Sequence, residues 1–147
     1  MKKILLAFSL ILFFSCENEN ESTPTEIAFT EIGKGFLTGS GSEGIIKSSK
    51  IIYTQSDWEN LVTQMNSSSI VSSSFTETYI EFDFYTVVAV FDQVRQTSNF
   101  SIEISRILET SDNLSISYFI EESSDGVPKT AQPFYLVKIP KTNKALE

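Results

Sequence analysis

The sequence predicts an α+β fold, in which a mostly antiparallel β-sheet of about six or seven strands carries one amphipathic helix packed on one face. Three observations predict it. Several short runs rich in Val, Ile, Phe and Tyr alternate apolar with polar residues, as half-buried strands do. Only one segment shows a strong helical period. That segment comes before most of the strands, and a helix segregated from a run of strands is typical of this class.

The first sixteen residues predict export and a lipid anchor. Lys2 and Lys3 precede an apolar run at 4–14, which is too short to cross a bilayer and is typical of a secretory signal peptide. The run ends in Phe-Phe-Ser-Cys, which resembles a lipobox. We therefore expect residues 1–15 to be removed as a lipoprotein signal peptide and Cys16 to receive the lipid. Cys16 is the only cysteine, so no intramolecular disulfide can form.

Residues 16–26 are predicted to be the lipidated cysteine and a flexible acidic tether. The stretch at 17–25 is polar, carries three glutamates and cannot bury enough apolar surface to fold. One acyl chain adds about 0.8 kcal/mol per buried CH₂ and anchors weakly, so stable attachment needs the two or three chains of a bacterial lipoprotein. We expect a cell-envelope protein at the outer membrane. The acids behind Cys16 resemble surface-export signals, although any solvated tether has this composition.

Residues 27–144 are expected to form one globular domain whose composition argues against several functions. Removing residues 1–15, which carry two lysines and no acid, lowers the net charge from −8 to about −10, so a nucleic-acid partner is not expected. The chain has no histidine, and its one thiol is predicted to be lipidated. The commonest general base, metal ligand and cysteine nucleophile are therefore missing. We expect no enzyme, no catalytic residue, no cofactor and no metal site.

Two β-prone runs, at 29–37 and 45–54, are joined by Gly39-Ser40-Gly41-Ser42-Glu43-Gly44. This loop satisfies the G-x-G-x-x-G pattern of dinucleotide-binding folds. That pattern binds phosphate only where a strand leads into a helix N-terminus. Here the following residues predict a strand, so we interpret the segment as a glycine-rich hairpin loop.

Ser56–Glu59 fits a capping box, so the helix is predicted to begin there. In this motif the Ser56 hydroxyl accepts from the amide of Glu59, and the Glu59 side chain accepts from the amide of Ser56. Trp58, Leu61, Val62 and Met65 follow at the spacing of one apolar stripe. We expect the stripe to pack on the sheet, with a partner-binding face as the alternative.

The remaining segments predict a serine-rich loop and four strands. Residues 66–74 are the loop, and the apolar run at 87–91 predicts a central strand covered on both faces. Alternating runs at 100–104 and 114–120, with Phe119 out of pattern and a turn at 110–113, predict an antiparallel hairpin with one wet face. A last strand at 134–139 is bracketed by Pro133 and Pro140.

Several local patterns together resemble the C-terminal domain family of PrcB, a family named for a protease complex subunit. The most specific is the closing Gln-Pro-aromatic strand that ends in Ile-Pro. The matching segments, which span nearly all of the globular part, are Phe36 with Gly39–Gly41, Ser56–Leu61, Ile80–Phe84, Val87–Val90, Ser101–Ile104 and Gln132–Pro140.

The chain departs from this family at Thr97-Ser98-Asn99-Phe100, where the family has a Thr-Gly-Gly-aromatic turn. Asparagine tolerates positive φ better than most residues, so Asn99 is expected to keep a left-handed turn while Ser98 reshapes the loop. A contact that this loop makes in relatives need not transfer. The resemblance implies no catalytic residues. It implies a non-catalytic protein-interaction module, an accessory subunit of a surface protease complex.

Two other functional classes stay open. A module that binds glycan or another envelope component needs exposed aromatics beside carboxylates. The candidates are Trp58, Tyr79, Tyr85 and Tyr118, with Glu81, Asp83 and Asp92. An enzyme or metal binder would need a carboxylate pair or a Ca²⁺ site. Asp83 and Asp92, which flank the central strand, or Asp125-Gly126 in a loop after Glu121-Glu122 could supply the carboxylates. Acids at strand ends are usually solvated turns.

Overall fold

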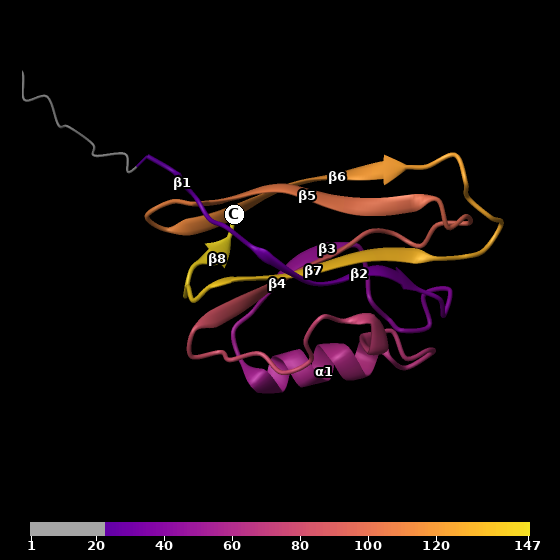
Figure 1. The fold of residues 1–147 in the computed structure, drawn as a ribbon, viewed down its shortest axis with the longest axis horizontal. Helices are drawn as coiled ribbons and strands as arrows, with labels where there is room; N and C mark the ends of the chain where they lie inside the picture. The colour runs from indigo at the N-terminus through magenta and orange to yellow at the C-terminus, as the bar shows by residue number, and fades with distance from the viewer. Residues whose placement is uncertain (1–22) are drawn as a thin grey trace, which may run out of the picture.

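The described part of the chain forms two four-stranded sheets and one helix, stacked in three layers (Figure 1). The computed structural model describes residues 23–147. The elements are β1 (Thr25–Glu26), β2 (Thr30–Leu37), β3 (Ser48–Ile52), α1 (Gln55–Met65), the 3₁₀ turn η1 (Ser72–Ser74), β4 (Tyr85–Phe91), β5 (Phe100–Glu109), β6 (Asn113–Glu122), β7 (Gln132–Pro140) and β8 (Ala145–Leu146).

Sheet A has the strand order β1-β5-β6-β8, and sheet B has the order β2-β7-β4-β3. All pairs are antiparallel except β6 with β8. A mostly antiparallel fold with one helix is therefore confirmed. The prediction of one sheet with six or seven strands is wrong, because the described residues form eight strands in two sheets. The short strands β1 and β8 were missed because two residues show no period.

Sheet B is the middle layer, and its central strands are apolar on both faces. Val87, Ala89 and Phe91 belong to the core beneath the helix, whereas Val88 and Val90 belong to the core between the sheets. Phe134 and Leu136 of β7 face the helix side, and Tyr135, Val137 and Ile139 face sheet A. The prediction that 87–91 is a central strand covered on both faces is confirmed.

The helix begins two residues earlier than the sequence predicts. Thr54 is the N-cap, with extended backbone (φ −132°, ψ 152°), and its hydroxyl oxygen accepts the amide of Asp57 at 3.2 Å. Glu59 accepts from the Gln55 side chain at 2.8 Å and does not reach back to an amide. The capping box predicted at Ser56 is therefore wrong, because Thr54-x-x-Asp57 is itself a capping pattern and lies directly after strand β3.

The apolar stripe of α1 packs on sheet B, as predicted. Trp58, Leu61 and Met65 are buried, and Val62 packs against the same core. The Trp58 ring lies 6.1 Å from that of Phe75, centroid to centroid. These side chains are therefore covered, and the alternative that the stripe is a partner-binding face is wrong.

The glycine-rich loop is not a hairpin loop. The strands that it joins, β2 and β3, are the two edges of sheet B and do not pair. The Gln132 side chain donates to the carbonyls of Ile45 and Asp92, at 2.8 Å each, and so holds the loop across the end of the central strands. Gly41 and Gly44 have positive φ, which turns the chain there. A strand follows the loop, so it lacks the helix that phosphate binding needs.

The predicted hairpin is confirmed as β5 and β6, which pair from Phe100 with Glu122 to Glu109 with Leu114. A register shift between Ile104 and Arg106 lets the strand continue beyond the predicted run. The last strand is also confirmed, although Pro133 and Pro140 are its second and last residues and not its flanks.

No helix within residues 23–147 has the length and apolar character needed to cross a membrane.

Replacing Trp58 tests the helix-side core. The side chain is 1 % exposed, and its indole N–H donates to the Thr78 carbonyl at 2.9 Å. We expect Trp58→Ala to lower the free energy of unfolding by about 3–5 kcal/mol. Urea unfolding followed by far-UV circular dichroism measures the loss. Trp58→Phe, which keeps a ring but leaves the Thr78 carbonyl unpaired, should lose less. An unchanged midpoint in the alanine variant would show that the ring is not core.

Candidate binding cleft

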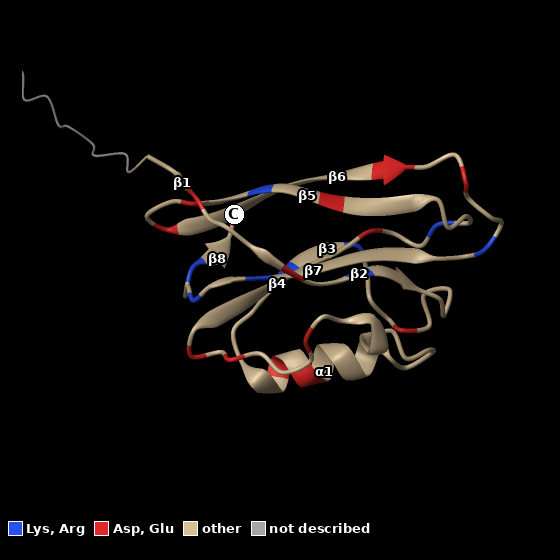
Figure 2. Cartoon of the chain, in the orientation of Figure 1, with Lys and Arg blue, Asp and Glu red and all other residues tan. Residues whose placement is uncertain are grey.

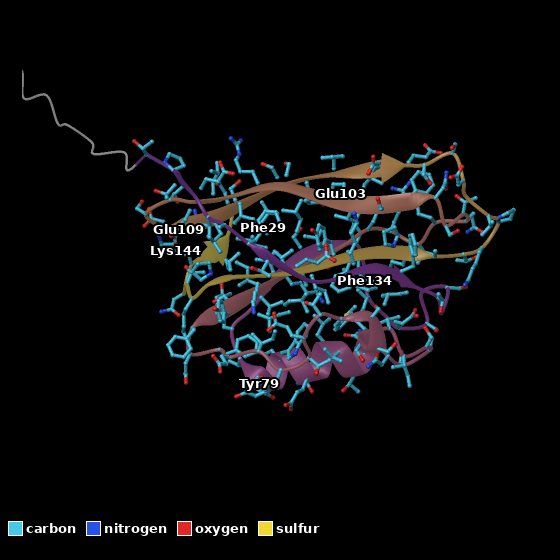
Figure 3. The ribbon with its side chains drawn as sticks, in the orientation of Figure 1. Phe29, Tyr79, Glu103, Glu109, Phe134 and Lys144 are labelled. Carbon is cyan, nitrogen blue, oxygen red and sulfur yellow. The ribbon has the colours of Figure 1, made fainter. Side chains whose placement is uncertain are left out.

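The loop that enters β4 and the first turn of α1 border a cleft of about 310 Å³. We call it the aromatic–acidic cleft, and its lining residues are Gln55, Tyr79, Ile80, Glu81, Phe82, Asp83 and Phe84. Gln55 comes from the helix and the other six from the loop. The cleft therefore lies in the helix layer, and Tyr79 is seen beside α1 in Figure 3.

Buried contacts give this loop its shape. Ile80 is buried in the helix-side core, and the Trp58 indole holds the carbonyl of Thr78. The amides of Phe84 and Tyr85 both donate to the Glu81 carbonyl at 2.9 Å, which closes a tight turn before β4. The Lys141 amide then pairs with the Phe84 carbonyl at 2.8 Å. The loop backbone is thus fixed at both ends. Four of its side chains project outward, those of Tyr79, Glu81, Asp83 and Phe84.

Two of the outward side chains are aromatic and largely exposed, Tyr79 at 70 % and Phe84 at 65 %. A single exposed apolar residue needs no explanation, but two beside one cleft mark a candidate binding surface. Phe82, half-buried between them in sequence, packs against the core. Phe82 therefore holds the loop that carries the Tyr79 and Phe84 rings against the folded domain.

The other two outward side chains are acidic. Glu81 and Asp83 are exposed, and neither takes part in an ion pair with any residue that the structure describes. Figure 2 shows acidic residues along the loop that enters β4 and on α1. The Gln55 side chain donates to Glu59, but its buried carbonyl oxygen receives no hydrogen bond within residues 23–147. The acceptors that the cleft exposes are therefore the carboxylates of Glu81 and Asp83.

Asp92 lies at the other end of β4 and is not part of the cleft. It is 0 % exposed, with Arg95 Nε at 2.7 Å from Oδ2 and Lys47 Nζ at 3.2 Å from Oδ1. Since the seven residues of β4 rise about 3.3 Å each, Asp83 and Asp92 are separated by roughly 20 Å or more. They cannot act as the acid–base pair that the sequence left open.

The surroundings of Asp92 stabilise its charged form. Burial by itself raises the pKa of this carboxyl, but the Gln93 amide and the side chains of Arg95 and Lys47 outweigh burial and lower the pKa below its usual 3.8. The cluster joins Lys47, just before β3, to the segment that follows β4. Its role is structural.

Of the aromatics proposed for a glycan site, only Tyr79 lies at the cleft. Trp58 is core, Tyr118 packs between the sheets, and Tyr85 is half-buried with Lys138 Nζ 4.6 Å from its ring centroid. Glu81 and Asp83 do lie beside Tyr79. Sequence reasoning missed Phe84, whose exposure depends on the turn, and Gln55, whose position depends on the earlier helix start.

The remaining candidates lie elsewhere. Cys16, the predicted lipidation site, is outside the described residues. Glu121–Gly126 is an exposed segment that comprises the end of β6 and the start of the following loop. In the described part of the chain no three acidic, histidine or cysteine side chains gather around a metal-sized space. Asn99 does not have positive φ, so the predicted left-handed turn is wrong. Its side chain instead donates to Glu122 and to the Ser123 carbonyl, at 3.1 Å each, which supports a different turn.

A second groove of about 260 Å³ runs between edge strand β3 and the helix. Its lining includes Lys50 and Ile52 on the strand and Asp57 and Leu61 on α1. A lysine in the middle of an edge strand discourages further strand pairing. This β3–α1 groove therefore has a weaker claim to bind a partner than the aromatic–acidic cleft.

Comparison of the chain with protein-family models, curated proteins and solved structures finds no significant match to any of them. The resemblance to the PrcB C-terminal domain family therefore stays a prediction.

The buried carboxylate predicts a pH-dependent stability. Because the pKa of Asp92 is lowered by folding, its contribution is present above the unfolded-state pKa of about 4 and is lost as the pH falls below that value. We expect Asp92→Asn to lower the free energy of unfolding at pH 7 by about 2 kcal/mol, and the gap from the wild type to shrink toward pH 3. Urea unfolding at several pH values measures both.

The matched control is Asp125→Asn, which changes an exposed carboxylate and should leave stability within about 0.5 kcal/mol. If the difference in unfolding free energy between the wild type and Asp92→Asn stayed constant from pH 7 to pH 3, the charged state assigned to Asp92 would be contradicted.

Proposed function

We propose that this chain is a lipid-anchored, non-catalytic interaction module of the bacterial cell envelope, which binds another envelope protein as an accessory subunit. The observation that carries the proposal is the aromatic–acidic cleft. Its exposed rings and unpaired carboxylates lie on a loop that buried contacts hold in place. Fixed apolar surface of this kind favours association. The protease complex is the partner that the family resemblance implies.

The position of β1, which connects the folded domain to the predicted tether, supports binding at this cleft. Strand β1, from which the chain leads back toward Cys16, belongs to sheet A, whereas helix α1, whose first turn lines the cleft, lies on the far side of sheet B (Figure 1). The eight residues at 17–24, between Cys16 and β1, span at most about 30 Å when extended. A domain held in this way can present its helix layer to a partner while sheet A lies toward the lipid.

The chemistry of the chain supports a binding role without catalysis. It has no histidine, and its single cysteine is the proposed lipid site. The carboxylates Asp83 and Asp92 are at opposite ends of β4, and Asp92 is committed to Arg95 and Lys47. The proposal therefore assigns no bond-breaking step to the domain.

Glycan binding is the second candidate function, because one specific observation favours it. Tyr79 is exposed beside Glu81 and Asp83, and sugar rings pack on aromatic faces while their hydroxyls donate to carboxylates. The two candidate functions use the same cleft and differ in the ligand that is recovered.

Capture from envelopes tests the proposed function. The full-length lipoprotein is crosslinked in cells, purified and analysed by mass spectrometry as wild type, as Tyr79→Ala/Phe84→Ala, and as Phe119→Ala. Phe119 is 54 % exposed on sheet A and is the matched control. We expect the wild type and the control to recover the same envelope protein, and the double variant to lose it at least tenfold.

All three proteins should melt alike, since the replaced rings are exposed. Equal recovery by the double variant, or recovery of glycan-linked material in place of a protein, would contradict the first proposal. The second of these outcomes would support the glycan function.

The anchor is tested separately with Cys16→Ala. The thiol is the only group in the chain that can receive a thioether-linked diacylglycerol, so the variant should leave the membrane fraction or keep residues 1–15. Membrane fractionation and labelling with palmitate measure the two effects. Labelled palmitate on the alanine variant would contradict the proposed lipid site.

A further inference from the structure

We propose that the aromatic–acidic cleft binds the guanidinium group of an arginine in an exposed segment of the partner protein. This inference rests on the proposed function and specifies the chemistry of the same site. It follows from the acceptors, the rings and the charge of the cleft.

The first step concerns hydrogen bonds. Glu81 and Asp83 contribute exposed carboxylates that pair with no cation of the described chain. The amide nitrogen of Gln55 is already used by Glu59 at 2.8 Å. Carboxylates and carbonyls only accept, whereas a guanidinium carries five N–H donors and no acceptor. The cleft and the guanidinium are therefore complementary.

The second step concerns the rings. A planar guanidinium stacks on aromatic faces more readily than a compact ammonium, and Tyr79 and Phe84 expose their rings on the same loop as the two carboxylates. This chain makes the same contact internally, because Arg95 Cζ lies 4.5 Å from the ring centroid of Phe100. An arginine can thus satisfy the acceptors and cover the rings together.

The third step concerns charge. The chain has a net charge of −8, and Asp57 and Glu59 in the first turns of α1 add to the negative field beside the cleft. Two lysines lie nearby and make contacts within the chain, one of them beside the cleft at Phe82. Lys138 pairs with Glu77 at 2.6 Å, and the Lys141 side chain donates to the Phe82 carbonyl. A cationic ligand therefore meets no competing ion pair at Glu81 or Asp83 from within residues 23–147.

Size and charge argue against other ligands. A space of about 310 Å³ is at the small end for ligand sites, which suits one side chain better than a cofactor. An anionic ligand would be repelled by both carboxylates. A sugar hydroxyl brings acceptors as well as donors, and these find little to pair with in a cleft rich in acceptors.

Binding of short peptides to the full-length lipoprotein in nanodiscs tests the inference. The probe is the blocked peptide Gly-Ser-Arg-Ser-Gly, followed by saturation-transfer NMR, and it is compared with the same peptide carrying citrulline, which has nearly the same shape without the charge. Chitotriose serves as the glycan probe. We expect the arginine peptide to bind at least tenfold more tightly than the citrulline peptide, and several-fold more weakly in 0.5 M salt than in 0.05 M salt.

Variants locate the site. Glu81→Gln/Asp83→Asn should weaken the arginine peptide at least tenfold, whereas Asp125→Asn should not, and thermal melts confirm that both proteins are folded. Equal binding of the citrulline peptide, or arginine binding unchanged in the double variant, would overturn the inference.

The outcomes separate this inference from the proposed function. If no arginine peptide binds but the envelope protein is still lost by Tyr79→Ala/Phe84→Ala, the cleft binds its partner through another chemistry, and only the inference fails. If chitotriose binds and the arginine peptide does not, both fail together.

Discussion

The structure depends on the pairing of β4 with β7 at the centre of sheet B. The two strands pair over seven positions, from Tyr85 with Pro140 to Phe91 with Phe134, and successive apolar side chains point to opposite faces. A strand that is apolar on both faces is stable only if both faces are covered. The helix covers one face and sheet A the other, so the three layers follow from this one pair.

The same pair explains why the two ends of β4 differ. At its end, Asp92 is buried among Lys47, Arg95 and the loop that Gln132 holds, so the charge is neutralised within the fold. At its start, the chain enters from a turn at the surface, where Glu81 and Asp83 stay exposed. Asp92, after β4, therefore stabilises the domain, whereas Glu81 and Asp83, before β4, remain exposed to solvent.

The parts of the fold that depend on local pattern could be predicted from the sequence. The continuous apolar run of β4, the stripe of α1 and the alternating hairpin of β5 and β6 all follow from residue spacing. The strand order could not be predicted, because β2 pairs with β7 about a hundred residues later and spacing holds no information about such a partner. The hairpin interpretation of the glycine-rich loop failed for this reason.

The cleft was only partly predictable. Tyr79, Glu81 and Asp83 were candidates because of their residue types, but so were Trp58, Tyr85, Tyr118 and Asp92, which the fold buries or covers. Exposure is set by which strand or helix lies above a residue, and that depends on the pairing of distant segments. Phe84 and Gln55 show the converse, since their sequence contexts are ordinary and only the turn and the helix start bring them to the cleft.

Residue-resolved hydrogen exchange of the lipoprotein, with and without its captured partner, is the most direct test of this account. In it, β4 and β7 form the stable centre of the fold and the loop entering β4 carries the aromatic–acidic cleft. The amides of β4 and β7 should exchange most slowly in both states, through global unfolding alone. In the loop that enters β4, the amides of Tyr79, Glu81 and Asp83 should exchange quickly in the free protein and become protected when the partner binds. Protection that appears in the β3–α1 groove or on sheet A, with the loop unchanged, would contradict this view.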